Sequence, residues 1–222
     1  MDMDTQNLGM TVKGLKNKIS GKNMKKIVDL MTDLKVKDSD TYTSELLKEQ
    51  YILHKSYVEG RIDTTKRTGV NVRLPCIPED ISENIIKFII HNKLNDKTTS
   101  WDCKKGDLES QIEGKQECKC FTSDGPLSFT PSSEWDVIYF LDARSWLTDK
   151  FILYRVPLKR SSSQFNNVKV NKTQTFEDQS NQGRRPRITW MSLYPQIESH
   201  CIKVFEGTFD DIFTDIRLAE EE

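Results

Sequence analysis

The sequence lacks several features that would place it in common classes of protein. No run approaches the roughly 20 apolar residues that a membrane span needs. The N-terminal stretch MDMDTQNLGMTVKG is polar and has no apolar segment like that of a secretory signal peptide, so we expect a cytoplasmic protein. The three histidines, at positions 54, 91 and 200, are too scattered to suggest a Ser/His/Asp triad or a histidine-rich metal site. The five cysteines include no C-x-x-C pair of the zinc-ribbon type, and their odd number favours reduced thiols.

The composition indicates a folded protein of about one domain. Of the 222 residues, 36% are hydrophobic and 30% are charged, which fits one globular domain or a domain with a small appendage. We expect an N-terminal helical region at residues 1–70 and a core at residues 71–222, which together form one compact domain.

The spacing of apolar residues predicts the elements of this fold. Residues 15–34 are predicted to form one broken helix or two short ones, and further helices are predicted at residues 38–60 and 78–90. The helix at residues 38–60 is expected to be capped by Asp38–Asp40 and to end near Gly60, with a loop at residues 64–69. Four strands are predicted, at residues 105–110, 115–121, 137–141 and 151–154, and the last two are continuous apolar runs typical of strands buried on both faces. Residues 159–189 are polar and basic and are expected to form a loop-rich surface segment before a last element at residues 197–213.

The net charge of −1 conceals an uneven distribution along the chain. Residues 71–149 carry 14 acidic and 9 basic side chains, whereas residues 150–190 carry 9 basic and only 2 acidic ones. Carboxylates can hold a metal ion and basic side chains can bind phosphates, so this pattern suits a metal-dependent enzyme that acts on a polyanion. An ordinary solvated surface would account for the charges equally well.

The residues that best suit such an enzyme lie in the predicted hairpin. Side chains alternate along a strand, so Glu117 and Lys119 share one face while the two flanking cysteines point to the other, apolar face. The neighbouring strand brings Asp107 alongside Glu117. Two converging carboxylates form a hard oxygen site suited to Mg²⁺, and the carbonyl of Cys118 could add a ligand. Lys119 could position a water molecule or stabilise developing charge on a phosphate.

This order of acid, spacer and acid-x-Lys resembles the catalytic hairpin of the PD-(D/E)xK nuclease superfamily, in particular that of single-domain type II restriction endonucleases. The resemblance covers about 20 residues. It implies an α/β fold with a central mixed sheet flanked by helices, and Mg²⁺-dependent, site-specific hydrolysis of double-stranded DNA that leaves 5′-phosphates. It also implies a homodimer that acts on a short palindrome. Family members often carry one more carboxylate on the preceding helix, where Glu83 fits and Glu45 and Glu49 compete.

Other interpretations of the hairpin remain open. Acid-x-Lys triplets occur at three further positions, which begin at Asp33, Asp102 and Glu113. Only Glu117 lies inside a predicted strand with an upstream partner strand. The hairpin could nevertheless carry only a solvated ion pair without a catalytic role.

The cysteines and the function class also leave alternatives. Cys118 and Cys120 could bind zinc with partners drawn from Cys76, Cys103 and His91, although strand alternation favours packing of both in the core. The chain could be a structure-specific or repair nuclease of the same superfamily, or a DNA-binding module without catalytic activity.

Basic and amide side chains gather at residues 159–190, where we expect a DNA-recognition segment. Arginine can pair with guanine through two hydrogen bonds, and asparagine or glutamine can pair with adenine. The residues expected to contact bases are Asn181, Gln182, Arg184, Arg185 and Arg187. Those expected to bind phosphates are Lys159, Arg160, Lys169 and Lys172. A plain basic loop is the alternative.

Overall fold

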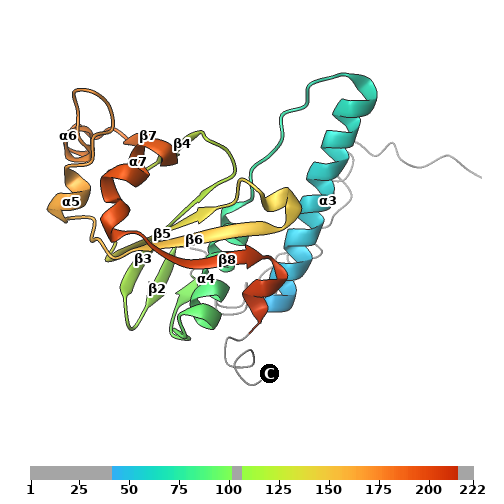
Figure 1. The fold of residues 1–222 in the computed structure, drawn as a ribbon, viewed down its shortest axis with the longest axis horizontal. Coiled ribbons are helices and arrows are strands. Elements are labelled where there is room, and N and C mark those ends of the chain that lie inside the picture. Colours follow the sequence, from blue (N-terminus) through green and yellow to red (C-terminus); the bar gives the residue numbers. More distant parts are fainter. Residues whose placement is uncertain (1–41, 102–106, 215–222) are drawn as a thin grey trace, which may run out of the picture. The chain divides into compact units, whose positions relative to one another are not determined.

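The computed structural model describes residues 42–101 and 107–214, which all belong to one unit of the chain that spans residues 39–222 (Figure 1). The helical stretch predicted at residues 15–34 lies outside the described residues. No helix within these described ranges is long and apolar enough to cross a membrane.

A six-stranded mixed sheet forms the centre of the unit. In spatial order its strands are β1 (Ser100–Trp101), β2 (Leu108–Ser110), β3 (Gly114–Phe121), β5 (Val137–Asp142), β6 (Lys150–Val156) and β8 (Ile202–Thr208). Strands β3 and β5 run parallel, and the other neighbouring pairs run antiparallel. The expected mixed sheet is confirmed, and the predicted last element contains β8 followed by the short helix η4 (Asp210–Phe213).

Strand β5 separates two hydrophobic cores. Its alternate residues point to opposite faces, with Tyr139 and Leu141 in one core and Ile138 and Phe140 in the other. The first core is covered by the helices α3 (Ser44–Thr68) and α4 (Glu79–Lys93). The second is covered by α5 (Ser163–Asn166), α6 (Phe176–Asn181) and α7 (Trp190–Ile197). The sheet is therefore flanked by helices and β5 is buried on both faces, as predicted, whereas β6 is only partly buried.

Helix α3 is longer than the sequence pattern predicts. Thr43, rather than Asp38–Asp40, caps its start, because the Thr43 hydroxyl accepts a hydrogen bond from the Leu46 amide at 3.2 Å. The expectation that Gly60 ends the helix is wrong, because glycine inside a helix costs only about 1 kcal/mol relative to alanine. The helix continues through the expected loop and ends before Gly69, whose φ of 71° is left-handed.

Residues 159–189 are a folded part of the molecule, contrary to the expectation of a surface segment poor in core residues. Phe165, Val168 and Phe176 are buried in the second core, although no regular spacing links them in the sequence. At the end of this segment, β7 (Arg187–Thr189) pairs with β4 (Pro126–Ser128) in a separate two-stranded sheet. The basic residues of the segment are therefore displayed on a defined framework.

Candidate active site

The hairpin of β2 and β3 forms as the sequence predicts. The two strands pair from Leu108 with Gln116 to Ser110 with Gly114. Gly114 makes the turn possible, because its φ of 74° lies in the left-handed region. Its α-carbon also faces the Asp136 carboxylate, so a side chain at this position would collide with it. The turn thereby fixes the register that places the acidic residues.

Asp107 lies directly before β2 and beside the middle of β3. Its Oδ1 atom accepts a hydrogen bond from the Cys118 amide at 2.9 Å. Its φ of 55° is left-handed, a conformation that aspartate tolerates better than most residues. The structure therefore brings Asp107 next to Glu117, as the pairing of the two strands predicts.

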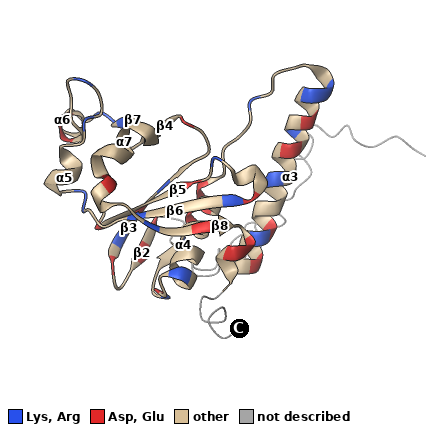
Figure 2. Cartoon of the chain, in the orientation of Figure 1, with Lys and Arg blue, Asp and Glu red and all other residues tan. Residues whose placement is uncertain are grey.

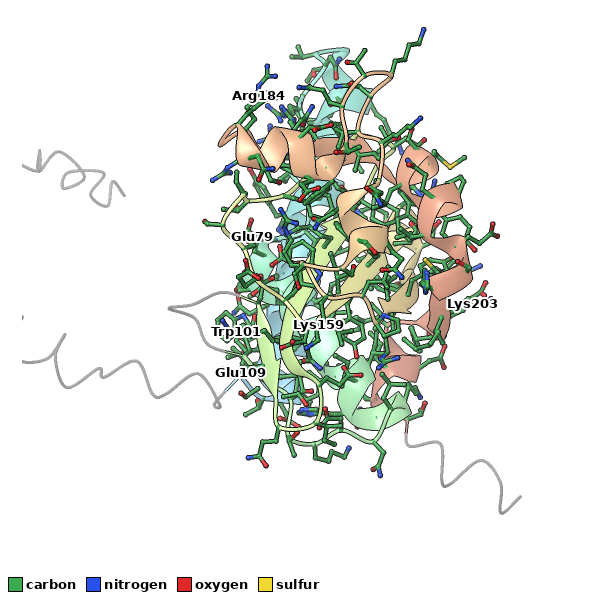
Figure 3. The ribbon with its side chains drawn as sticks, turned by 90° about the vertical axis from the view of Figure 1, so that its left-hand side faces the viewer. Glu79, Trp101, Glu109, Lys159, Arg184 and Lys203 are labelled. Carbon is green, nitrogen blue, oxygen red and sulfur yellow. The ribbon has the colours of Figure 1, made fainter. Side chains whose placement is uncertain are left out.

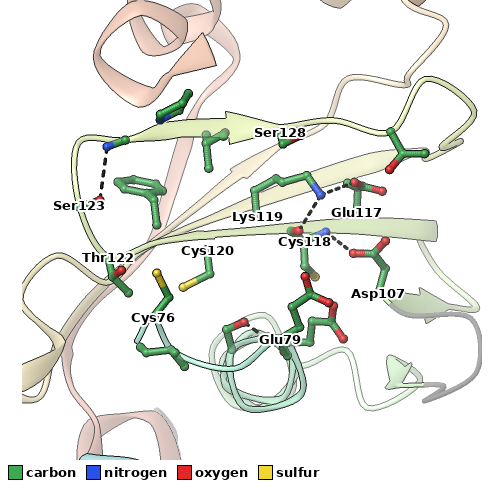
Figure 4. Close-up of a pocket in the computed structure, with 18 of the residues that line it drawn as sticks. Cys76, Glu79, Asp107, Glu117, Cys118, Lys119, Cys120, Thr122, Ser123 and Ser128 are labelled. Atoms are coloured by element: carbon green, nitrogen blue, oxygen red, sulfur yellow. Dashed lines mark hydrogen bonds and ion pairs between the residues drawn. The ribbon is translucent and has the colours of Figure 1, made fainter. Parts of the chain in front are cut away.

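Glu117 and Lys119 point from the same face of β3 into one pocket (Figure 4). The pocket has a volume of about 470 Å³ and is also lined by Glu83 of α4 and by residues of β4. The Lys119 Nζ atom lies 2.5 Å from Glu117 Oε1 and donates a second hydrogen bond to the Cys118 carbonyl at 3.3 Å. The Glu117 side chain is only 5% exposed. This pair is consequently no solvated surface ion pair.

Burial and mutual repulsion dominate the electrostatics of the pocket. Burial raises the pKa of Glu117 to about 7, with a further contribution from the charge of Asp107, despite the opposing effect of Lys119. Burial also raises the pKa of Glu83 to about 7, although the Trp101 indole donates a hydrogen bond to Glu83 Oε2 at 2.5 Å. For Lys119, burial is the largest single effect and lowers the pKa, but the charge of Glu117, the hydrogen bond to it and the charge of Asp107 together outweigh burial, so the pKa is raised. The pocket thus holds more negative charge than Lys119 alone balances.

The donor set of this pocket suits a hard divalent cation. Among the described residues, no group of three histidine, cysteine, aspartate or glutamate side chains is arranged to hold a metal ion by itself. Asp107 and Glu117 could instead hold Mg²⁺ with the Cys118 carbonyl and water, since Mg²⁺ usually keeps several waters and one or two carboxylates. A cation there would also relieve the repulsion between the carboxylates. The residues present therefore fit Mg²⁺.

The cysteines next to the pair do not favour zinc. Cys118 is buried in the first core, and Cys120 packs against it. Burial raises the pKa of Cys120 to about 12 and that of Cys118 well above its usual value, so the thiolates that zinc binds are disfavoured. Cys103, one of the suggested partners, lies outside the described residues.

The pocket also contains an acid that the sequence did not single out. Glu79 lies one helical turn before Glu83, and both line the pocket from α4. Their spacing of four residues was the available signal, because it places both side chains on one helix face. Glu45 and Glu49, which compete with Glu83 in the sequence, belong to α3 and are absent from the lining of this pocket.

The residues expected to contact bases are exposed, but none of them lines the pocket. They lie at the end of α6, in the following loop and on β7: Asn181, Gln182, Arg184, Arg185 and Arg187. Arg187 pairs with Ser128 in the small sheet, and β4 lines the pocket through Ser128. This pairing links the basic segment to the site. Figure 3 shows Arg184 at the outer end of the basic segment.

The residues expected to bind phosphates are not equivalent. Lys159, Lys169 and Lys172 are exposed, and the Lys159 Nζ atom forms an ion pair with Asp136 Oδ1 at 3.2 Å. Arg160 is only 8% exposed, and its guanidinium donates hydrogen bonds to Asn166 and Ser180 and stacks 4.6 Å from the Phe176 ring. Contrary to the expectation, Arg160 is positioned to hold the second core together rather than to meet a phosphate.

Two comparisons with known proteins find the same relationship. Residues 40–197 match the model of the family described as Bsp6I restriction endonuclease. The chain is 31% identical over 139 residues to the type II restriction enzyme Bsp6I of Bacillus sp. (strain RFL6), a match that covers 63% of this chain and 73% of that enzyme. No solved structure matches the chain. The family match includes both the hairpin and the basic segment.

Proposed function

We propose that Asp107, Glu117 and Lys119 catalyse the reaction of this chain, which belongs to the Bsp6I restriction endonuclease family and is a type II site-specific deoxyribonuclease. The supporting observation is that these three side chains meet in one pocket beside Glu83. The reaction is Mg²⁺-dependent hydrolysis of a DNA phosphodiester that leaves a 5′-phosphate. The protein acts in the cytoplasm on double-stranded DNA, as a homodimer.

Asp107 and Glu117 would hold the cation as charged ligands, and the carbonyl of Cys118 would add a neutral one. The chemistry supplied there would be that of a Lewis acid, with charge neutralised on the scissile phosphate and a lower pKa for a water beside it. The hydrogen bond from the Cys118 amide to Asp107 holds that carboxylate in place before the cation arrives. Glu83, which accepts a hydrogen bond from the Trp101 indole, lines the same site.

Lys119 acts as a hydrogen-bond donor. Its raised pKa keeps the ammonium protonated at neutral pH, so it is not suited to remove a proton from water. The ion pair with Glu117 directs the ammonium into the pocket. There it orients the attacking water or stabilises the negative charge that develops on the phosphate oxygens.

Recognition of the DNA site belongs to the exposed residues beside the pocket. Arg184, Arg185 and Arg187, with Asn181 and Gln182, contact base edges in the major groove. Lys159, Lys169 and Lys172 bind phosphates and fix the position of the protein on the duplex. Arg187 lies on β7, which pairs with β4, and β4 lines the pocket. A contact between Arg187 and DNA therefore acts on a strand of the pocket.

The proposal is tested by removing each charge of the pair separately. Glu117→Gln and Lys119→Met should each lower kcat for plasmid cleavage by about 10³-fold or more, because both groups act on the transition state. DNA affinity should change much less in the Lys119→Met variant. Cleavage by the wild type should require Mg²⁺, and its products should be joined by DNA ligase without prior phosphorylation.

Matched controls are available on the same hairpin. Glu109 and Lys115 are exposed and face each other across β2 and β3. Glu109→Gln and Lys115→Met should therefore retain kcat within about twofold, since surface substitutions of this kind have small effects. If the site variants cut as fast as these controls, or if Lys119→Met loses affinity and kcat equally, the assignment of the catalytic residues is wrong.

A further inference from the structure

The end of α3 and the chain that follows it form a basic projection. We call residues 61–75 the distal arm. Lys66, Arg67 and Arg73 are exposed on it, and residues 64–78 contain no acidic residue. Figure 2 shows basic residues at this end of α3, and the acidic residues Glu59 and Asp63 precede them on the helix. Within residues 42–101 and 107–214, none of the three basic side chains forms an ion pair.

The distal arm is folded rather than a free loop. The Arg61 guanidinium donates two hydrogen bonds to the Arg73 carbonyl, at 3.2 and 3.0 Å, and lies 5.6 Å from the Tyr57 ring. The Val72 amide donates a hydrogen bond to the Thr65 hydroxyl at 3.3 Å. These contacts fasten the returning chain to the helix and hold the backbone that carries the basic side chains.

The distal arm leads directly into the pocket. Cys76, Ile77 and Glu79 all line it, and Arg73 precedes Cys76 by three residues. Three residues span at most about 10 Å, which is less than the width of about 12 Å of the major groove of DNA. A strand bound at the pocket would therefore have neighbouring phosphates within reach of the arm.

The distal arm and the basic segment at residues 159–190 border the pocket from different sides. In Figure 4, Cys76 and Glu79 lie on one side of β3, and β4 with Ser128 lies on the other. The distal arm continues α3, which covers the first core, and the basic segment belongs to the lobe over the second core, but both extend toward the top of the view in Figure 1. DNA that enters between them can touch both.

Helix electrostatics accounts for only part of this charge. Lys66 and Arg67 lie in the last turn of α3, where basic side chains interact favourably with the helix dipole. Arg73 lies beyond the end of the helix at Gly69, so the dipole does not explain it. A ligand with regularly spaced negative charges explains all three residues.

We propose that the distal arm is a second DNA-contacting surface, in which Lys66, Arg67 and Arg73 bind phosphates of the duplex on the side of the pocket away from β4. This inference rests on double-stranded DNA being the substrate. It does not depend on which residues catalyse the cleavage.

The test compares the variant Lys66→Gln/Arg67→Gln/Arg73→Gln with the wild type. Binding to a short fluorescein-labelled duplex of random sequence is measured by fluorescence anisotropy in EDTA, over a range of KCl concentrations. The slope of log affinity against log salt should become shallower by about 3 units, because each phosphate contact contributes about 0.9. In plasmid cleavage with Mg²⁺, KM should rise about tenfold while kcat stays within about twofold.

The charge-matched control is Lys97→Gln/Lys150→Gln/Lys203→Gln. These lysines are exposed, none lines the pocket, and Figure 3 shows Lys203 on the side away from Glu79. The control should keep the wild-type slope. Equal changes in both variants would mean that only net charge matters, and an unchanged slope in the arm variant would overturn the proposal.

Two further measurements test the proposal if the triple variant does not fold or if the arm serves another contact. If the triple variant does not fold, Arg73→Gln, which lies outside the helix, should reduce the slope by about 1 unit. Analytical ultracentrifugation of the arm variant tests the rival use of the arm as a contact between two copies of the chain. A loss of self-association with an unchanged salt slope would assign the arm to that contact instead.

Discussion

Buried carboxylates in this protein fall into two kinds that differ in their neighbours. Asp96 is 5% exposed, and burial raises its pKa, but hydrogen bonds from Ser110, Thr98 and Thr99 outweigh burial and lower the pKa. Glu117 is equally buried, yet burial raises its pKa and the facing carboxylate of Asp107 raises it further. Asp96 is thus satisfied as an anion by the fold, whereas the pKa of Glu117 stays raised even with the Lys119 ammonium beside it. The first arrangement is structural and the second suits a site.

The role of Asp96 predicts a pH-dependent stability. A carboxylate whose pKa is lower in the folded than in the unfolded protein stabilises the fold above the unfolded value, near 4 for aspartate, and loses this effect as the pH falls. Asp96→Asn should lower the free energy of unfolding by about 2 kcal/mol at pH 7, because it weakens hydrogen bonds to a charged group. Urea unfolding of both proteins at several pH values measures this difference in the free energy of unfolding. The difference between variant and wild type should shrink below about pH 4, and a constant difference would show that charge is not involved.

At the level of single residues, the sequence predicts the placement of the site where the rule is local. Strand alternation places Glu117 and Lys119 on one face, and the hairpin places Asp107 beside them. Arg160 could not be judged in this way. Its burial depends on Phe176 and Ser180, whose approach is fixed by the tertiary fold and leaves no local pattern.

The prediction of helices and turns from the sequence has the same limit. A glycine can mark a turn, a helix end or neither, and its backbone conformation decides which. Gly60 lies inside α3 with open space where a side-chain carbon would stand, whereas Gly114 has a φ of 74° and faces Asp136. Gly183 has a similar φ of 68° but open space around it. The sequence predicts the turn at Gly114 correctly from the strands around it, but it does not reveal that Gly60 keeps a helical backbone.

These differences predict opposite effects of one substitution. Gly60→Ala should stabilise the protein by about 0.5–1 kcal/mol, because alanine favours the helix. Gly114→Ala should destabilise it by about 2–3 kcal/mol, since the left-handed φ and the collision with Asp136 act together. Gly183→Ala, as the control with strain but no collision, should cost about 1–2 kcal/mol. Urea unfolding gives all three values. Equal losses at Gly114 and Gly183 would contradict the role of Asp136.

The whole molecule is organised around β5, which the two cores share. The first core lies between the sheet and α4, the helix that carries Glu83. The second core lies between the sheet and the lobe of residues 159–189. The sequence predicts β5 and β6 from their apolar runs and β2 and β3 from the hairpin pattern, but not β1, which has only two residues. It does not predict the lobe, because Phe165, Val168 and Phe176 contact one another without a periodic spacing, and their burial emerges only in three dimensions.

One chain carries one Glu117–Lys119 pair, whereas cutting a duplex requires hydrolysis of two strands of opposite polarity. Two copies related by a twofold axis would present two such pairs with matching polarity, and this arrangement favours a palindromic site. Sedimentation equilibrium with a short duplex that carries the site should therefore give the mass of two chains plus one duplex. Supercoiled plasmid should become linear without accumulation of nicked circles, because both strands are cut in one encounter. A single-chain mass together with nicked circles as an early product would show that one copy cuts the strands in turn.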